Sequence, residues 1–536
     1  MPDGSELEIK LAIPEHRLFD LILNDPEIVA MMQEQKPVVR AFEAFYYDTS
    51  QFLLQKNGYA YRIRHEGQDW VATVKSDLSS SGGLSEREEW NEKVAGPEPS
   101  SKPFAGTNVG DRLALILGAE KLQLLFSTRF SRTTACLLTD GGAAIEMALD
   151  KGTIWSGLAG IPICELELEL KEGAPSELMK LAARIAGRWH LLPEVKSKFA
   201  RGLELLQTSN PELKAIFNQL PPEKKPEPTP MILLNSQMKE LFLLQSDLFN
   251  ATPTPENIKA LRIQCRRLRS LLKFYQPCFA KDAFHLYSER LRQWGILLGQ
   301  IRDLDVLVNS WGKFTTRFQP IVSTSTTWLD PVRERREFLA EDVFHRLRQG
   351  NLTQLLLEIQ GWLYHMEEQQ QSGREEHWAD YFVQKSFFQT IKELRQDIRD
   401  LRGLESIKVL HRFRIRIKRL RYLQESFTSY PRYHDEEFCA ALKKLQGQMG
   451  KIHDAAQIKC LLDQFDAGSE NDNLRLEKEL FICWRTRDLL GYYDELPKAV
   501  ETFRQSAKQR LRTLAAMRTN RGAKARQDAG THEPGK

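Results

Sequence analysis

The sequence lacks a long hydrophobic run. No stretch of about 18 uncharged apolar residues occurs in its 536 residues, so we expect no transmembrane helix and no membrane partner. The N-terminal segment carries acidic residues where a secretory signal needs a basic region followed by an apolar run. The seven cysteines are scattered and never stand in Cys-x-x-Cys spacing, which predicts neither a disulfide framework nor a zinc site. These absences predict a reducing, cytoplasmic compartment.

A strong net charge of one sign is also lacking. The 76 Lys and Arg residues nearly cancel the 72 Asp and Glu residues, which leaves a net charge of +4. This balance excludes a uniformly basic nucleic-acid coat protein, although two opposite local patches would cancel in the same sum. Hydrophobic residues at 41% and charged residues at 28% are typical of a soluble globular protein.

Two sequence patterns meet near residue 220. Residues 1–205 contain short runs that alternate with period two between Gly-containing turns, which predicts about eight antiparallel strands with a few helices. Residues 206–232 are rich in proline and predict an extended linker. Residues 233–515 repeat apolar positions at the helical period, so we expect an all-α domain. Residues 516–536 are polar and basic, and they predict a disordered tail. The fold class is therefore α+β.

The helical half contains an internal repeat. The segment IKALRIQCRRLRSLLKFY at 258–275 resembles LHRFRIRIKRLRYLQESF at 410–427. Further along, LLGQIRDLDVL at 297–307 resembles GQMGKIHDAAQI at 447–458. Because both matches occur at nearly the same offset, we predict two duplicated helical bundles.

Charged residues are sorted onto particular faces of the predicted strands. Alternate residues of a strand share a face, and here charged faces lie opposite apolar ones. The charged residues are Glu6, Glu8 and Lys10; Arg62 and Arg64; Lys75; Arg87 and Glu89; Arg132; Glu146 and Asp150; and Glu165, Glu167 and Glu169. A face in water would explain any one of these strands. Their recurrence predicts instead an eight-stranded β-barrel tunnel with the charges inside, wide enough for one small ligand.

The types of charge inside such a tunnel indicate the ligand. Clustered carboxylates are the hard oxygen donors that Mg²⁺ or Mn²⁺ prefers. Lys and Arg side chains around them suit the oxygens of a phosphate chain. A lumen full of charge is costly unless a ligand neutralises it. The pattern therefore predicts a metal-assisted phosphoanhydride site.

The ordered series of these residues resembles the CYTH domain, also called the triphosphate tunnel metalloenzymes, over residues 5–205. The segments that carry the resemblance are ExExK at 6–10, FEAFYYDT at 42–49, YAYRIR at 59–64, WVATVK at 70–75, LSEREEW at 84–90, FSTRFSR at 126–132, IEMALDKG at 145–152, CELELEL at 164–170 and KSKFARG at 196–202. The resemblance implies a tunnel that holds a triphosphate. Its implied catalytic and substrate-binding residues are Lys10, Arg62, Arg64, Lys75, Arg87, Arg132, Lys198 and Arg201. Its implied ligands for Mg²⁺ or Mn²⁺ are Glu6, Glu8, Glu89, Glu146, Asp150, Glu165, Glu167 and Glu169.

Two helices of the second half each carry a row of cations. Helical spacing places on one face Arg262, Arg266, Arg269 and Lys273 in the first copy, and His411, Arg414, Lys418 and Arg421 in the second. Like charges one turn apart destabilise a helix, so such faces indicate an anionic partner. The alternative is a solvated face that is paired with acids on neighbouring helices.

Residues 230–515 resemble the CHAD domain, a helical module often fused to CYTH domains. Its basic helices begin with HxxR, which His411 and Arg414 match, whereas Lys259 replaces the histidine before Arg262. The resemblance implies binding of inorganic polyphosphate. These helices lack interleaved stacking aromatics, which favours a phosphate chain over nucleic acid.

The whole chain thus resembles bacterial CYTH–CHAD inorganic triphosphatases. This resemblance implies metal-dependent hydrolysis of tripolyphosphate to pyrophosphate and phosphate, with polyphosphate bound by the helical domain. Two alternatives on the same fold are a class IV-type adenylate cyclase and a thiamine triphosphatase. A third alternative is a non-catalytic polyphosphate-binding scaffold.

Overall fold

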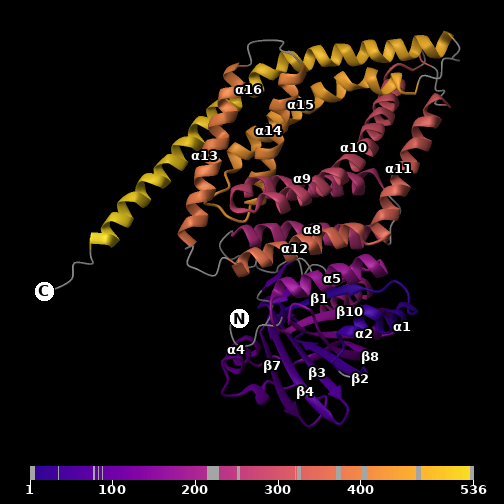
Figure 1. Cartoon of the computed structure of the whole chain (residues 1–536), viewed down its shortest axis with the longest axis vertical. Coiled ribbons are helices and arrows are strands. Elements are labelled where there is room, and N and C mark those ends of the chain that lie inside the picture. Colours follow the sequence, from indigo (N-terminus) through magenta and orange to yellow (C-terminus); the bar gives the residue numbers. More distant parts are fainter. Residues whose placement is uncertain are drawn as a thin grey trace. The chain divides into compact units, whose positions relative to one another are not determined.

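The chain divides into two compact units, one that holds a β-sheet and one that is helical (Figure 1). The computed structural model describes residues 7–33, 36–76, 79–81, 84–86, 88–213, 229–249, 254–319, 322, 327–369, 376–400, 407–465 and 472–530. The first unit comprises Met1–Lys225, Met238–Thr252 and Phe344–Gln371. The second comprises Pro226–Gln237, Pro253–Val343 and Ser372–Lys536. The predicted α+β class is confirmed.

The described strands form one antiparallel sheet of eleven strands. Eight of them have six residues or more: β1 Leu7–Ala12, β2 Val38–Asp48, β3 Tyr59–Glu66, β4 Asp69–Ser76, β7 Glu89–Val94, β8 Gln123–Leu138, β9 Ala144–Ser156 and β10 Ala159–Glu172. The three short strands are β5 Ser79–Ser81, β6 Leu84–Glu86 and β11 Leu192–Pro193. The strand order is β5-β6-β1-β10-β9-β8-β2-β3-β4-β7, and β11 pairs with β1. This order has two ends, so the part of the chain described here forms an open sheet, and its closure into a barrel remains a prediction.

The antiparallel register places opposite charges beside one another on the charged face. Lys10 of β1 lies opposite Glu167 of β10. Arg132 of β8 lies opposite Asp150 of β9. Lys75 of β4 lies opposite Glu89 of β7 in the same way. Directly opposed unlike charges stabilise a strand pair, so the sorting of charges along the sequence becomes a set of cross-strand pairs.

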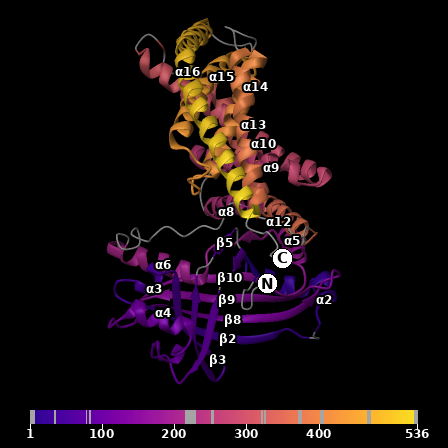
Figure 2. The same ribbon diagram turned by 90° about the vertical axis from the view of Figure 1, so that its left-hand side faces the viewer.

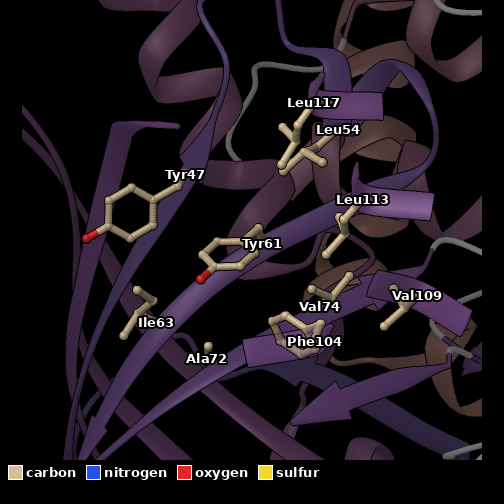
Figure 3. Close-up of a cluster of buried hydrophobic side chains, with 10 residues drawn as sticks. All are labelled: Tyr47, Leu54, Tyr61, Ile63, Ala72, Val74, Phe104, Val109, Leu113 and Leu117. Atoms are coloured by element: carbon tan, nitrogen blue, oxygen red, sulfur yellow. The ribbon is translucent and has the colours of Figure 1, made fainter. Parts of the chain in front are cut away.

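The opposite face of the sheet is apolar and covered by short helices. Tyr47, Tyr61 and Val74 pack there against α3 Leu53–Lys56, the 3₁₀-helix η1 Lys102–Phe104 and α4 Asn108–Leu117 (Figure 3). The Tyr61 hydroxyl donates to the Ser100 carbonyl at 2.9 Å. This burial holds the strands with their charged face directed away from the apolar core.

Further helices complete the first unit. They are α1 Leu18–Leu23, α2 Pro26–Met31, α5 Pro175–Trp189, α6 Lys198–Ser209 and α12 Asn351–Gln369, together with the 3₁₀-helix η2 Pro211–Leu213 and the end of α8 Pro230–Phe249. Helix α12 packs on α5, and the Ser176 hydroxyl donates to Glu368 at 2.8 Å. This pair joins residues far apart in the sequence. Helix α6 packs on β8, β9 and β10 (Figure 2).

The second unit contains α9 Pro255–Phe274, α10 Lys281–Arg317, α11 Asp330–Arg348, α13 Glu376–Asp400, α14 Ile407–Ser426, α15 Glu436–Asp463, α16 Asp472–Gly530 and the 3₁₀-helices η3 Gln276–Cys278 and η4 Thr327–Leu329, with the end of α11 in the first unit. Helix α9 packs on α10, α14 packs on α15, and the basic helices α9 and α14 pack on each other. The repeated segments therefore form equivalent helix pairs that meet at their basic members. Among the helices described in either unit, none combines the length and apolarity needed to cross a membrane.

The ends of the predicted linker and tail differ from the structure. Helix α6 continues to Ser209 and α8 begins at Pro230, while residues 214–228 lie outside the described part. Helix α16 extends to Gly530, so residues 516–530 of the predicted disordered tail are helical. The segment is rich in Ala, Arg, Lys and Gln, which are good helix formers, and it extends an existing helix without a new nucleation step.

Candidate functional site

A cavity of about 590 Å³ lies on the charged face of the sheet. The predicted residues that line it are Glu8, Lys10, Arg62, Arg64, Lys75, Glu89, Arg132, Glu167, Glu169 and Lys198. They come from six strands and the first turn of α6. The fold thus brings together around one space side chains that are spread over almost 200 residues of sequence.

Three buried carboxylates form the acidic centre of the site. Asp150, Glu165 and Glu167 each offer an oxygen, and these oxygens lie within 4.8 Å of one another. The Lys198 ammonium hydrogen-bonds to all three, at 2.7 Å to Asp150 Oδ2 and 3.0 Å to Glu167 Oε1. Buried charges need such partners because each would otherwise lose its hydration without compensation.

Further cations complete this network. Arg132 binds Asp150 through two bonds, from Nε to Oδ1 at 2.7 Å and from Nη2 to Oδ2 at 2.6 Å, and it also binds Glu167. The Lys10 ammonium donates to Glu167 Oε1 at 2.7 Å. Arg201 binds Glu165. The paired guanidinium geometry fixes Arg132 in one orientation toward the cavity.

The network keeps both signs of charge at neutral pH. Burial alone would raise the pKa of the Glu167 carboxyl, but Arg132 and Lys10 hold it well below its ordinary value. Burial alone would lower the pKa of Lys198, but the three carboxylates around it raise that pKa above its ordinary value. The carboxylate of Glu167 and the ammonium of Lys198 are therefore both charged at pH 7.

The local sequence explains how α6 places its cations. The Ser197 hydroxyl accepts a hydrogen bond from the Ala200 amide at 3.1 Å and caps the helix, so Lys198 and Arg201 follow on its first turn. Gly202 comes next, and a Cβ at this position would lie 2.2 Å from the Phe126 ring. The missing side chain lets α6 approach the sheet closely enough for its cations to reach the carboxylates.

A second charged group lies at another wall of the cavity. Glu89 forms ion pairs with Lys75 and, at 3.5 Å, with Arg62. Burial alone would raise the pKa of Glu89, but Lys75 and Arg62 lower it to about 2. Burial and the neighbouring Arg62 lower the pKa of Arg64 to about 10. Glu89 is thus already paired with two cations. An anionic ligand beside Arg64 would stabilise the charge of its guanidinium group, which burial and Arg62 disfavour.

The carboxylates differ in their access to the cavity. Glu8, Glu167 and Glu169 line it, whereas Asp150 and Glu165 contact Lys198 and are not among the lining residues. Glu8 and Glu169 lie directly opposite each other in the register of β1 and β10. Glu8 is paired with Lys10 at 3.3 Å and Glu169 with Lys171 at 2.6 Å. Carboxylate oxygens are also the donors that Mg²⁺ and Mn²⁺ take. The donor chemistry on this wall fits such an ion.

The remaining predicted tunnel residues lie elsewhere. Glu6 and Arg87 lie outside the described residues. Glu146 lines a second cavity of about 280 Å³, not the first. Charge sorting also missed further lining residues, among them Tyr46 and Asn91. They lie on the charged faces of β2 and β7 with the right period-two spacing, but they carry no charge.

The helical unit has its own cluster of cations. Arg262 of α9 and Arg414 of α14 are equivalent residues of the repeat, and in both the Nε atom is buried without a hydrogen-bond partner. Burial and Arg266 lower the pKa of Arg262 to about 10. Burial first, and then Arg414, lower the pKa of Lys418 to about 7. These cations repel one another.

Two acids lie within electrostatic range of this cluster. Asp303 of α10 and Asp454 of α15 are the matched acids of the repeat, and both act on Arg414. Burial raises the pKa of Asp303, and Asp454 raises it further against the effect of Arg262. The two copies of the repeat therefore meet at their equivalent arginines and acids.

The other predicted polyphosphate-binding residues are distributed around this centre. His411 is exposed, with its ring 5.8 Å from that of His453. Arg269 and Lys273 line a separate cavity of about 410 Å³. Arg421 is bound to Glu425 at 2.7 Å and to Gln446 at 2.5 Å. Arg421 already has an acidic and a polar hydrogen-bond partner within the protein, whereas the Arg262 Nε atom has no hydrogen-bond partner.

Two domain models match the chain. Residues 4–203 match the model of the CYTH domain, and residues 237–463 match the model of the CHAD domain. The chain therefore contains a CYTH domain followed by a CHAD domain, as the resemblance in sequence predicts.

Comparison with individual proteins gives the particular relatives. The inorganic triphosphatase of Haemophilus influenzae is 30% identical over 198 residues, which are 37% of this chain and 54% of that protein. The chain thus matches about half the length of this curated relative. A CHAD domain structure from Ricinus communis is 19% identical with a TM-score of 0.39, and covers 52% of this chain and 90% of its own. A putative adenylyl cyclase from Hippeastrum, described as having a dominant triphosphatase activity, is 20% identical with a TM-score of 0.29, over 37% of this chain and 95% of its own.

Proposed function

We propose that the CYTH domain hydrolyses inorganic tripolyphosphate to pyrophosphate and phosphate with Mg²⁺ or Mn²⁺, and that the CHAD domain binds inorganic polyphosphate. The observation that carries the first part is the buried network of Asp150, Glu165 and Glu167 with Lys198, beside a cavity lined by cations. Such a cavity favours a polyanion, and its acids favour a metal. The proposal includes closure of the sheet around the substrate.

The lining cations bind the phosphate oxygens in this proposal. Lys10, Arg62, Arg64, Lys75 and Arg132 contact the chain and stabilise the charge that develops on the leaving pyrophosphate. Lys198, which also lines the cavity, and Arg201 hold the carboxylates in position. Arg87 joins the cations on the resemblance alone.

The carboxylates that line the cavity are the proposed metal ligands. Glu8, Glu167 and Glu169 have the access, and Glu6 joins them on the resemblance alone. When bound, Mg²⁺ or Mn²⁺ would neutralise charge on the phosphate chain and lower the pKa of a water molecule. Asp150 and Glu165 orient Glu167 indirectly, because all three share the Lys198 ammonium.

Phosphate release by the full chain tests the enzyme proposal. Tripolyphosphate, ATP and thiamine triphosphate are each supplied with and without Mg²⁺ or Mn²⁺. We expect metal-dependent release that is fastest from tripolyphosphate. Formation of cyclic AMP from ATP would support the adenylate cyclase alternative. Faster phosphate release from thiamine triphosphate would support the thiamine triphosphatase alternative. If none of the three substrates is turned over with metal, the enzyme proposal is wrong and the non-catalytic scaffold is the alternative that stands.

The convergence of unpaired cations carries the polyphosphate proposal. Arg262 and Arg414 have buried guanidinium nitrogens without hydrogen-bond partners. A phosphate chain would supply acceptors to both and screen their repulsion from Arg266. Asp303 and Asp454 act electrostatically against the repulsion between these cations, so they limit the net charge of the cluster in the absence of ligand.

Polyphosphate affinity should depend on pH through Lys418. Its pKa is lowered to about 7 by burial, Arg414, Arg266 and Arg262, against an opposing effect of Asp454. An anion favours the protonated ammonium, so affinity should be high below pH 7 and fall about tenfold as the pH rises through it. Titration calorimetry across this range measures the effect.

A charge-preserving substitution provides the control. Lys418→Arg keeps the charge at every pH used, and it should bind polyphosphate with little pH dependence. The pKa of His453 is lowered to about 3 by burial, Arg414 and Lys418, so its ring stays neutral throughout and does not contribute. A pH dependence in Lys418→Arg equal to that of the native chain would assign the effect to another group.

A further inference from the structure

Two cavities follow one another along the same strands. The larger is the site described above, and the smaller has a volume of about 280 Å³. On β2, Tyr46 lines the larger cavity, Arg40 lines the smaller, and Phe42 between them lines both. The residues common to both cavities are Phe42, Arg64 and Arg132, one each from β2, β3 and β8. The smaller cavity therefore continues the larger one beyond the level of Phe42.

An aromatic pair occupies this level. The rings of Phe42 and Phe130 stack with centroids 5.4 Å apart and planes at 20°. The Arg64 and Arg132 guanidinium carbons lie 5.6 and 6.0 Å from the centre of the Phe42 ring. Phe42 is buried, although it lies on the charged face of its strand. An apolar ring offers no hydrogen bond to a phosphate, so substrate binding does not explain why Phe42 stands on the charged face of the sheet.

The two sides of the ring differ in character. The larger cavity contains the carboxylate network and the proposed metal ligands. The smaller contains Arg40, together with Glu66 and Glu146. Arg40 is exposed, so the smaller cavity opens to solvent. Arg40 lies two positions from Phe42, about 7 Å along the strand, and it lines the smaller cavity but not the larger one.

We propose that Phe42 limits the length of the phosphate chain that the site accepts, and that Arg40 would bind the next phosphate if the ring were removed. The inference rests on the proposed hydrolysis of tripolyphosphate and specifies its chain-length preference. The physical reason is desolvation. A phosphate pressed against the ring loses water and gains no hydrogen bond from it, whereas a phosphate beside Arg40 gains one.

The experiment compares chain lengths in Phe42→Ala and the native full chain. The value of kcat/KM is measured for linear tripolyphosphate and linear pentapolyphosphate, and the ratio of the two is the readout. We expect the ratio to shift toward pentapolyphosphate by about tenfold or more in Phe42→Ala. Adding Arg40→Gln to that variant should remove most of the gain, which general loosening of the sheet would not do.

A matched variant controls for loss of an aromatic side chain. Phe45→Ala changes the same strand on its apolar face, where Phe45 packs on the core, and it should leave the ratio unchanged. If Phe42→Ala does not fold, Phe42→Val gives the same comparison with a smaller change in volume. An unchanged ratio in a folded Phe42 variant that hydrolyses tripolyphosphate would overturn the inference.

Failure of the proposed function would be seen separately. If the native chain hydrolyses neither substrate, the dissociation constants of the two chain lengths, measured by titration calorimetry, replace kcat/KM. The ratio of these constants should shift in the same direction in Phe42→Ala. A ratio equal to that of the native chain would then overturn the chain-length inference as well.

Discussion

Metal-dependent phosphate release should fall by at least about 10²-fold when Glu167 is replaced by Gln. Glu167 is the carboxylate common to the buried network and the cavity wall, since it binds Lys10, Arg132 and Lys198 and also lines the cavity. The amide keeps the shape of the side chain but removes the charge that holds a metal and orders three cations. Steady-state kinetics over a range of Mn²⁺ concentrations measure the loss.

A second glutamate separates this effect from a general loss of charge. Glu43 lies on β2 and pairs with the exposed Arg129 at 2.5 Å, away from the cavity. Glu43→Gln should retain native turnover. Glu167→Gln should also unfold at a lower temperature. Buried cations that are less well paired should lower the free energy of unfolding by about 1–3 kcal/mol. Native turnover in a folded Glu167→Gln chain would refute the role given to this residue.

Polyphosphate affinity should fall by about 10²-fold or more when Arg262 and Arg414 are both replaced by Gln, with little change in tripolyphosphate hydrolysis. Hydrogen bonds from a charged donor contribute about 1.5–3 kcal/mol each, and the two guanidinium groups are the equivalent centres of the repeated basic helices. Titration calorimetry with long-chain polyphosphate measures the affinity, and phosphate release from tripolyphosphate measures the catalytic activity.

The stability of this double variant distinguishes binding residues from structural ones. The pKa of Arg262 is lowered to about 10 because burial and Arg266 destabilise its charge in the free protein. Removing both charges should therefore leave the melting temperature equal to or above that of the native chain. Arg416→Gln is the matched control on α14, since Arg416 is exposed and bonded to Asp397 at 2.6 and 2.5 Å. Equal loss of affinity in the control would mean that only the overall charge matters.

Both experiments use the full chain for a structural reason. Helix α12 and the end of α8 belong to the same compact unit as the sheet. Within that unit, α12 covers α5, where a Cβ on Gly361 would lie 3.0 Å from that of Met179. A chain truncated before the helical half would expose this apolar contact, so loss of activity in it would not report on the cavity.

The alternation of residues was enough to place many charged side chains on one face of the sheet. Lys10, Arg132 and Glu167 were assigned to the charged faces of their strands from the period of two alone, and the structure places all three around the cavity. Period two is a local property, so it needs no knowledge of distant contacts. The same alternation could not show that Glu146 would line a different cavity, because that depends on its position along β9 relative to the neighbouring strands.

Register and helix packing required the tertiary structure. Lys198 stands on a helix that follows the strands, and only the packing of α6 on β8, β9 and β10 brings its ammonium to Asp150 and Glu167. The close approach depends on the absence of a side chain at Gly202, which no periodicity shows. Likewise, the linker composition suggested separate domains, whereas the contact of α12 with α5 places part of the helical half in the first compact unit.

By itself, the sequence determined the two structural classes, the repeated basic helices and the sorting of charge, since all three follow from spacing between near neighbours. The tertiary structure alone decided which opposite charges pair, which carboxylates reach the cavity, and that Phe42 lines two cavities. These features depend on contacts between strands and helices far apart in the chain. Such contacts are set by the free energy of packing the whole fold, to which any one segment contributes only a small part.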